Sequence, residues 1–459
     1  MSRGRGIESA VPEGRLDRGL WTLAACALAV RAAYLLLEPH CALTGDEPSW
    51  IELGRQLARP AIAFSPLRSD LVFYPPVYPY LVGALYRLFG SMAAVLWAQV
   101  VLGALLVPIV GRAAAHAFGP RAALPAAAVT AFYPELVWYS AHYWSETVFL
   151  LLLWAAIERA LAADATASRR TAVVAGVLFG LATLARELSL YLVPLVVLWM
   201  ARPWAMNANA LGTRMVLSRN RLVGAGALLL ATVLTIAPWT LRNAIVFRAF
   251  VPVSTMGGLN LWQGNTTLTH LQIYDVLAGL DGPVAQDRYC RRLAWETIAA
   301  RQPAWLFEKL GEQMPEFWKA GSEVLDHLVG RNACGPVEPA RLVAIELLLV
   351  LPYLALLALA IVGLVRVRLT PPAVLLLVLA AAYNAAHVAA YATTRFRLPI
   401  LPVLFMLAAA LLVGRRDGTL APLGGRRLVV LVVLALAAIA VLAPGMEELV
   451  TWQRLTGRS

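Results

Sequence analysis

The chain has 459 residues, of which 60% are hydrophobic and 14% are charged. A soluble globular protein is close to half apolar and a quarter charged, so this chain departs from that class in both respects. Its mean hydropathy of +0.68 is also too high for a single core wrapped in polar surface. The composition therefore excludes a disordered, fibrous or ordinary cytosolic protein and indicates a polytopic membrane protein.

The net charge of +12 comes from 39 basic and 27 acidic residues. Nearly all of the basic residues are arginines that stand between apolar runs. Binding to nucleic acid would require these charges to cluster on a soluble face, so nucleic acid is not an expected partner. Arginines in short loops instead orient membrane helices, because cytoplasmic loops carry an excess of Lys and Arg.

A helix that spans the membrane needs about 20 apolar residues, and about eleven runs approach that length. In chain order they cover residues 19–37, 93–111, 122–141, 146–163, 171–185, 189–202, 222–240, 342–364, 371–390, 398–414 and 428–444. The runs 171–185 and 189–202 are so close that they form either a tight hairpin or one broken helix. The sequence thus predicts an all-α polytopic membrane protein.

The loop arginines predict a cytoplasmic N-terminus in the inner membrane of the cell, because every second loop is arginine-rich when the chain starts on that side. The chain then divides into an N-terminal membrane module 1–240 with a first outer loop 38–92, an extracytoplasmic segment 241–341, C-terminal membrane helices 342–444 and an outer tail 445–459. Cys290 and Cys334 share the extracytoplasmic segment and could pair if that side is oxidising.

The first outer loop carries the strongest candidate for acid–base chemistry. Asp46 and Glu47 precede Pro48, a pattern that is typical of a helix cap. Two acids at the membrane boundary are equally a candidate general base. Helical spacing of apolar residues predicts short amphipathic helices after Trp50 and over 77–89, and Tyr74 between them is either an interfacial aromatic or a substrate contact.

Other outward charges lie at predicted hairpin tips. Glu146, with His142 nearby, opens the fourth run, where it is either a helix-dipole partner or a second functional carboxylate. Arg186 and Glu187 are interpreted as a mutually satisfied pair when taken alone. Arg186 and His142 are also candidate contacts to the substrate or its lipid phosphate.

Three arginines run against the positive-inside bias. Arg395 and Arg397 open the 398–414 run, and Arg242 follows the seventh run ahead of a Gly257-Gly258 turn. Outward arginines either reach lipid headgroups or bind an anionic ligand, and a guanidinium suits a phosphate well.

Two other classes of function are open at this point. A transporter or flippase would place paired charges near the midplane and show related halves, and neither pattern is visible. The interpretation as a membrane acyltransferase rests on His387 and Asn384, which lie within the 371–390 run.

The order of the motifs resembles a known family. GDEPSW follows the first helix, then come a PP-x-YP segment, SET at the fourth helix, GLATLARE at the fifth, PW-x-LRN at the seventh and RFRLPILP late in the chain. This order is similar to that of the membrane glycosyltransferases related to protein O-mannosyltransferases and the lipid A aminoarabinose transferase, which have the GT-C fold. The resemblance covers roughly residues 15–415.

The resemblance implies transfer of a sugar from a polyprenyl-phosphate donor to a glycan, lipid or protein acceptor on the outer face. It implies that Asp46, with Glu47 adjacent, is the catalytic base, that Glu146 is a second acidic position, and that Arg395 and Arg397, with Arg242 less directly, bind the lipid phosphate. Tyr74 stands where aminoarabinose transferases carry a lysine, which puts that donor in doubt. No cofactor is expected with certainty; a divalent metal held by the outer acids and His142 is left open.

Overall fold

The computed structural model describes residues 13–37, 41–59, 72–202, 218–331, 333, 335 and 337–446, and the expected outer tail 445–459 lies almost wholly outside them. Within these residues all regular structure is helical, as expected. The first group of helices comprises α1 Glu13–Leu37, α2 Glu47–Leu57, α4 Val77–Phe89, α5 Ala93–Phe118, α6 Pro120–Phe132, α7 Pro134–Ser140, α8 Glu146–Thr166, α9 Arg169–Ala185, α10 Ser189–Ala201 and α11 Arg219–Phe247. The second comprises α12 Met256–Gln263, α13 His270–Ala278, α14 Gly282–Ala300, α15 Ala304–Glu308, α16 Met314–Trp318, α17 Glu323–Leu325, α18 Pro339–Arg366, α19 Pro371–Ala389, α20 Leu401–Asp417 and α21 Gly425–Met446.

Six described helices are long and apolar enough to cross a membrane: α1, α5, α11, α18, α19 and α21. The remaining predicted runs also fold as helices. The helices α6, α7, α9, α10 and α20 have at most 17 residues, whereas α8 has 21 residues but includes four charged side chains. The run 122–141, for example, breaks between α6 and α7, where Pro134 begins a new helix after the extended residue Tyr133. The all-helical membrane architecture is therefore confirmed, whereas the number of eleven spans stays a prediction.

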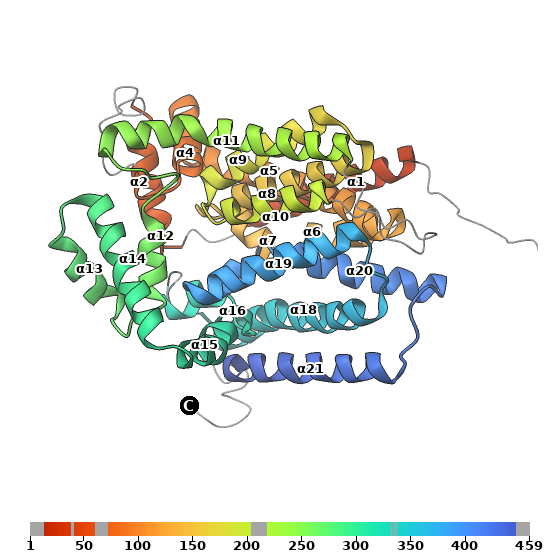
Figure 1. Cartoon of the computed structure of the whole chain (residues 1–459). Helices are drawn as coiled ribbons and strands as arrows, with labels where there is room; N and C mark the ends of the chain where they lie inside the picture. Colours follow the sequence, from red (N-terminus) through yellow and green to blue (C-terminus); the bar gives the residue numbers. More distant parts are fainter. Residues whose placement is uncertain are drawn as a thin grey trace, which may run out of the picture.

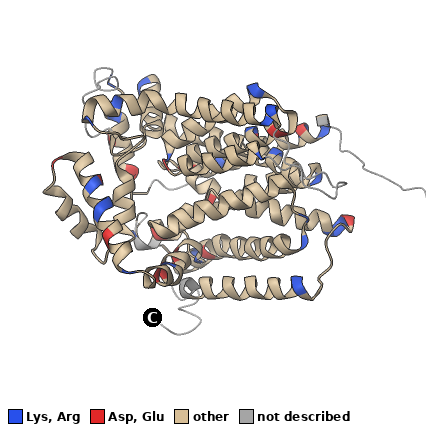
Figure 2. Ribbon diagram, in the orientation of Figure 1, with Lys and Arg blue, Asp and Glu red and all other residues tan. Residues whose placement is uncertain are grey.

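The long helices lie side by side, and the short helices gather at one end of the bundle, on the left of Figure 1. That end carries α2 and α4 from the first outer loop together with α12 to α16 from the segment 241–341. Many arginines lie at the opposite end, where α18 turns into α19 and α20 turns into α21 (Figure 2). These turns carry the same arginines from which the cytoplasmic side is predicted, so the orientation stays a prediction.

The two amphipathic helices of the first outer loop form where the apolar spacing predicts them, and they pack on each other. Trp50 on α2 and Tyr78 and Val82 on α4 are buried in one cluster. Gly54 allows the helices to approach closely, since a Cβ atom there would lie 2.2 Å from a methyl carbon of Val82. The loop therefore forms a packed unit above the bundle.

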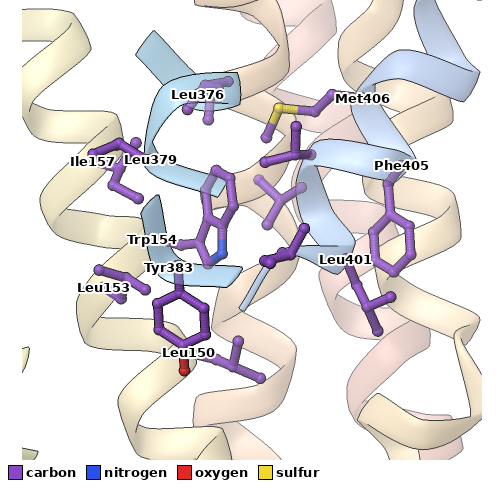
Figure 3. Packing of buried hydrophobic residues seen from close by; sticks show 14 of the residues in the cluster. Leu150, Leu153, Trp154, Ile157, Leu376, Leu379, Tyr383, Leu401, Phe405 and Met406 are labelled. Atoms are coloured by element: carbon purple, nitrogen blue, oxygen red, sulfur yellow. The ribbon is translucent and has the colours of Figure 1, made fainter. Parts of the chain in front are cut away.

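A buried apolar core joins the first membrane module to the C-terminal helices. Trp154 of α8 lies between side chains of α19, such as Leu379, and of α20, such as Leu401 (Figure 3). Its indole N–H donates to the carbonyl oxygen of Pro399 at 3.2 Å. This packing holds the segment before α20, which carries Arg395, against the first module.

The runs 171–185 and 189–202 are a hairpin of separate helices, α9 and α10, that pack on each other. Arg202, after α10, pairs at 2.8 Å with Asp164, which precedes α9, so the two ends meet on the same side.

The suggested pairing of Cys290 is wrong, because Cys290 is a free, buried thiol, and Cys334 lies outside the described residues. Cys41, at the outer end of α1, is disulfide-bonded.

Candidate functional site

Two cavities meet at the end of the bundle that carries the short helices. The first, of about 700 Å³, is bordered largely by polar and charged side chains from α12, α16, α17 and α18. The second, of about 350 Å³, lies between α10, α12, α14 and the end of α19. Both cavities are lined by Asp46, Tyr74, Met256, Asn260, Tyr391, Arg395 and Phe396. A molecule in one cavity can therefore contact a molecule in the other at Asp46 and Arg395.

Asp46 and Arg395 are in direct contact although 349 residues separate them in the chain. A guanidinium nitrogen of Arg395 donates to Oδ2 of Asp46 at 3.0 Å, and the Asp46 side chain remains 37% exposed. The guanidinium lies over the rings of Trp144 and Phe396, at 4.8 and 5.1 Å. Burial lowers the pKa of Arg395, but the carboxylates of Asp46, Glu146 and Glu323 outweigh it and raise the pKa, so the cation is permanent.

The backbone before α2 presents the Asp46 side chain to the cavities. Gly45 adopts φ +59°, a left-handed conformation that favours glycine. Asp46 stands at the cap position of α2, as the cap interpretation requires, but its side chain makes no capping hydrogen bond. The carboxylate bonds to Arg395 instead, which favours a functional role over capping.

A second ion pair lies beside the second cavity. Arg186, which lines that cavity, pairs with Glu146, whose side chain is 2% exposed. The interpretation of Arg186 and Glu187 as a mutual pair is therefore wrong. Glu187 accepts a hydrogen bond from Ser254 at 2.8 Å, and burial raises its pKa.

The expected turn at Gly257-Gly258 is wrong, because both glycines lie at the start of helix α12. The Gly258 N–H donates to Asp287 of α14 at 2.8 Å, and a Cβ at Gly258 would lie 2.4 Å from the Asp287 carbonyl oxygen. These glycines thus permit the close approach of α12 and α14.

The side chain of Arg397 has other partners than the side chain of Arg395. Its side chain is 1% exposed and pairs at 3.2 Å with Glu135 of α7. It also donates to the Gly321 carbonyl at 2.9 Å, and its guanidinium lies 4.0 Å from the Tyr353 ring centroid. Because Gly321 lines the first cavity, this hydrogen bond stabilises the wall of the cavity, although Arg397 does not line it.

Glu47 and His142 are also buried behind the cavities. Glu47 accepts hydrogen bonds from the backbone N–H groups of Thr44 and Tyr143 at 3.0 and 3.1 Å. Burial raises the pKa of Glu47, and these two bonds partly oppose the rise. The His142 ring stacks on Trp138 with 3.8 Å between centroids. Both side chains fix the 142–144 turn that carries Trp144.

Of the remaining candidates, Tyr74 lines both cavities and packs 4.5 Å from the Trp50 ring. Arg242 lies on α11 over the Trp239 ring at 5.0 Å, outside the lining of either cavity. His387 lines the second cavity, stacked 4.2 Å from Phe396, so it shares the site with Asp46 and Arg395.

Sequence reasoning missed the charged wall of the first cavity formed by Glu323, Arg331 and Glu346. Glu346 gave a signal, because it is a single carboxylate inside the apolar run 342–364. Glu323 and Arg331, paired at 2.7 Å, stand in a polar segment where nothing distinguishes them from ordinary surface charges.

In the part of the chain that the structure describes, no group of three or more His, Cys, Asp or Glu side chains is placed to hold a metal ion. Asp46, Glu47, Glu146 and His142 in particular do not form one set of ligands, since Asp46 faces the cavities and the other three are buried with separate partners. Within the described residues, these donors therefore do not fit a metal centre.

Comparison with known proteins supports the resemblance seen in the motifs. The family model for dolichyl-phosphate-mannose-protein mannosyltransferase matches residues 74–253. No curated protein matches the sequence significantly.

Among solved structures, the apo oligosaccharyltransferase of Archaeoglobus fulgidus is 14% identical with a TM-score of 0.53, covering 93% of this chain and 55% of that one. The same enzyme with an inhibitory peptide and a dolichol-phosphate gives 15% identity and a TM-score of 0.51, with the same coverage. ArnT from Cupriavidus metallidurans bound to undecaprenyl phosphate, at 15% identity, gives a TM-score of 0.38 and covers 89% of this chain and 79% of that one. The chain thus spans about 55% of the length of the oligosaccharyltransferase. The expected resemblance to GT-C glycosyltransferases is confirmed by the family model over residues 74–253, and the expected fold by the archaeal enzyme.

Proposed function

We propose that this protein is a membrane glycosyltransferase that moves a sugar from a polyprenyl-phosphate donor to an acceptor hydroxyl, or a similar group, on the extracytoplasmic face. The observation that carries the proposal is the contact of Asp46 with Arg395 at 3.0 Å, at the junction of two cavities. A general base and a phosphate ligand stand side by side there, as a transfer between two bound molecules requires.

The second cavity suits the donor. Arg186 and Arg395 line it together with apolar and aromatic side chains such as Leu261, Tyr191 and Trp295. A lipid phosphate needs both features, a cationic end for the phosphate and apolar walls for the first isoprene units. The fold shared with an oligosaccharyltransferase crystallised with a dolichol-phosphate supports this assignment.

The first cavity suits the acceptor. It is larger and is bordered by polar groups, among them Asn260, Gln263 and Glu323. Such groups orient hydroxyl-bearing molecules through hydrogen bonds. Tyr74 and Tyr391 stand between the two cavities and would flank the transferred sugar.

The chemistry follows from this placement. Asp46 takes the proton of the acceptor hydroxyl as its oxygen bonds to the anomeric carbon. The bond from that carbon to the phosphate oxygen breaks, and its electron pair leaves with the polyprenyl phosphate, whose charge Arg395 and Arg186 stabilise. Attack opposite the phosphate inverts the anomeric centre. Glu146 acts through Arg186, which it holds in place.

The Asp46–Arg395 pair also sets the order of events. While Arg395 bonds to Asp46, its guanidinium occupies Oδ2 of the carboxylate, so this oxygen is not available to the acceptor hydroxyl. A donor phosphate competes for the same guanidinium and frees Asp46. The base therefore becomes fully active once the donor is bound, which limits loss of the sugar to water.

The extracytoplasmic placement rests on two features. Arginine-rich turns lie at the opposite end of the bundle, as in cytoplasmic loops (Figure 2). Cys41, beside the site, is disulfide-bonded, and disulfides persist on oxidising sides of membranes. In a bacterial cell this corresponds to the outer face of the inner membrane.

The direct test is incubation of the purified protein with a panel of polyprenyl-phosphate hexoses and pentoses, beginning with mannose, and measurement of donor consumption. Consumption of one donor, with release of polyprenyl phosphate, is expected. If no member of the panel is bound or consumed, the proposal is wrong.

Asp46→Asn is expected to lower turnover by about 10²–10⁴-fold, the contribution of a general base, while the protein stays folded. The matched control is Glu52→Gln, an exposed carboxylate on the same helix whose side chain bonds only to Gln56, at 2.9 Å. Near-normal turnover of Asp46→Asn would remove Asp46 from its role as the base.

A further inference from the structure

A basic pocket lies at the end of the bundle opposite the two cavities. It has a volume of about 700 Å³ and is formed by the turn after α18 and the segment 418–425 between α20 and α21. Three arginines line it, Arg368, Arg426 and Arg427, and its remaining walls are small or uncharged residues. The turns that line it, after α18 and after α20, lie at the end of the bundle opposite α2, on the right of Figure 1.

The segment that forms the pocket is held in place by specific bonds. Arg366 donates through Nε to the Ala421 carbonyl at 3.1 Å, and the Ala421 N–H donates back to the Arg366 carbonyl at 2.9 Å. Ala421 is buried by this exchange. The end of α18 and the 418–425 segment are thus joined directly, so the three arginines are presented on a fixed frame.

The charges in the pocket have no internal partner. Other arginines at this end do: Arg121 pairs with Asp417 at 2.6 Å, and Arg202 pairs with Asp164 at 2.8 Å. Among the described residues, no ion pair includes Arg368, Arg426 or Arg427. The only acidic residue between positions 366 and 427 is Asp417, and Arg121 occupies it. The three like charges around this cavity are solvent-exposed and open to an anion from outside.

The position of the pocket indicates where that anion comes from. α18 ends and α21 begins at the pocket, and both are candidate membrane spans, so it lies at the level of the lipid headgroups. The apolar stretch of α21 is 0% buried inside the chain and offers a lipid-facing surface beside the pocket. A phospholipid can place its phosphate among the arginines and its acyl chains along α21.

We infer that this basic pocket binds the phosphate of an anionic phospholipid from the leaflet at that end, and so holds α21 on the bundle. Basic pockets between membrane helices are suited to such headgroups. The inference is independent of the proposed function, because none of its residues lies near the cavities.

The test measures binding of phosphatidylglycerol and phosphatidylcholine to the full-length protein by native mass spectrometry. The pocket variant carries Arg368→Gln, Arg426→Gln and Arg427→Gln. Its matched control carries Arg170→Gln, Arg415→Gln and Arg416→Gln, which removes the same charge from exposed positions at the same end outside the pocket lining. Each arginine is expected to contribute about fivefold to the affinity for the headgroup, so the pocket variant should bind phosphatidylglycerol roughly 100-fold more weakly. The control variant should lose much less affinity.

Equal losses in the pocket variant and the control would overturn the inference, since they would reflect general surface charge. Unchanged binding of phosphatidylglycerol in both variants would also overturn the inference. Competition by millimolar inorganic phosphate against phosphatidylglycerol would identify a soluble anion as the occupant and would also overturn it. A triple Arg→Lys variant is expected to keep part of the affinity for phosphatidylglycerol. All variants are expected to melt at temperatures close to that of the parent protein.

Discussion

Arg395 and Arg397 stand two residues apart on one turn of 3₁₀ helix, Thr394–Arg397, yet they lie in different environments. Arg395 lines two cavities and pairs with Asp46, whose side chain is 37% exposed. Arg397 is sealed against Glu135, whose side chain is 5% exposed. The first pair can open to admit a ligand, whereas the second has no room for one.

The contrast shows that the exposure of the arginine itself decides what it does. The side chains of Arg395 and Arg186 are 19% and 18% exposed and line a cavity, so each can bind a phosphate. A guanidinium that is itself buried with the carboxylate it neutralises, as in Arg397, is part of the framework, because its removal leaves an isolated charge in the interior. The motif RFR therefore supplies one ligand-binding arginine and one structural arginine.

The largest expected effect is on the buried pair. Arg397→Gln leaves the Glu135 carboxylate without its cation and is expected to lower the free energy of unfolding by about 3–5 kcal/mol. Thermal unfolding in detergent measures the loss. The double variant Arg397→Gln, Glu135→Gln removes both charges and should recover much of it. Unchanged stability combined with weakened donor binding would show that Arg397 is a ligand after all.

Arg395→Gln is expected to act on the reaction with little effect on stability. Loss of one charged group that stabilises the leaving phosphate lowers kcat/KM by about 10²–10³-fold. Asp46 remains partly solvated without its partner, so the melting temperature should stay close to that of the parent. Steady-state kinetics and thermal unfolding on the same preparation test both statements. A fall in kcat/KM of less than about tenfold would contradict the assigned role.

Glu146→Gln should give a smaller and different effect. The substitution removes the charge that holds Arg186, which binds the donor phosphate and stabilises it as it leaves, so kcat/KM is expected to fall about tenfold. A fall in kcat of the size expected for Asp46→Asn would instead make Glu146 a catalytic residue.

Much of the architecture could be predicted because apolar runs and loop arginines are local signals. The amphipathic helices α2 and α4 followed from apolar spacing, and Asp46 stood out because two acids follow the first membrane helix. The partners could not be predicted in the same way. Arg397 meets Glu135 across 262 residues, and Arg186 chooses Glu146 over its neighbour Glu187. Such choices depend on which helices pack together, and the spacing of residues along the chain does not encode that.

The smallest expected effect concerns Glu47, the neighbour of Asp46 that is buried rather than exposed. Burial raises its pKa above the unfolded value, so the folded protein binds this proton more tightly than the unfolded chain does. The slope of stability with pH follows the difference in bound protons between the unfolded and folded states, which is negative here. The stabilising contribution of Glu47 is therefore complete at pH values below its pKa in the unfolded chain. It decreases as the pH rises from that pKa to the raised pKa of the folded protein. Glu47→Gln should remove this slope from melting curves recorded between about pH 4.5 and 7, while Glu52→Gln should keep it. A slope that persists in Glu47→Gln would assign it to other buried carboxyls, such as Glu187 or Glu323, whose pKa values burial also raises.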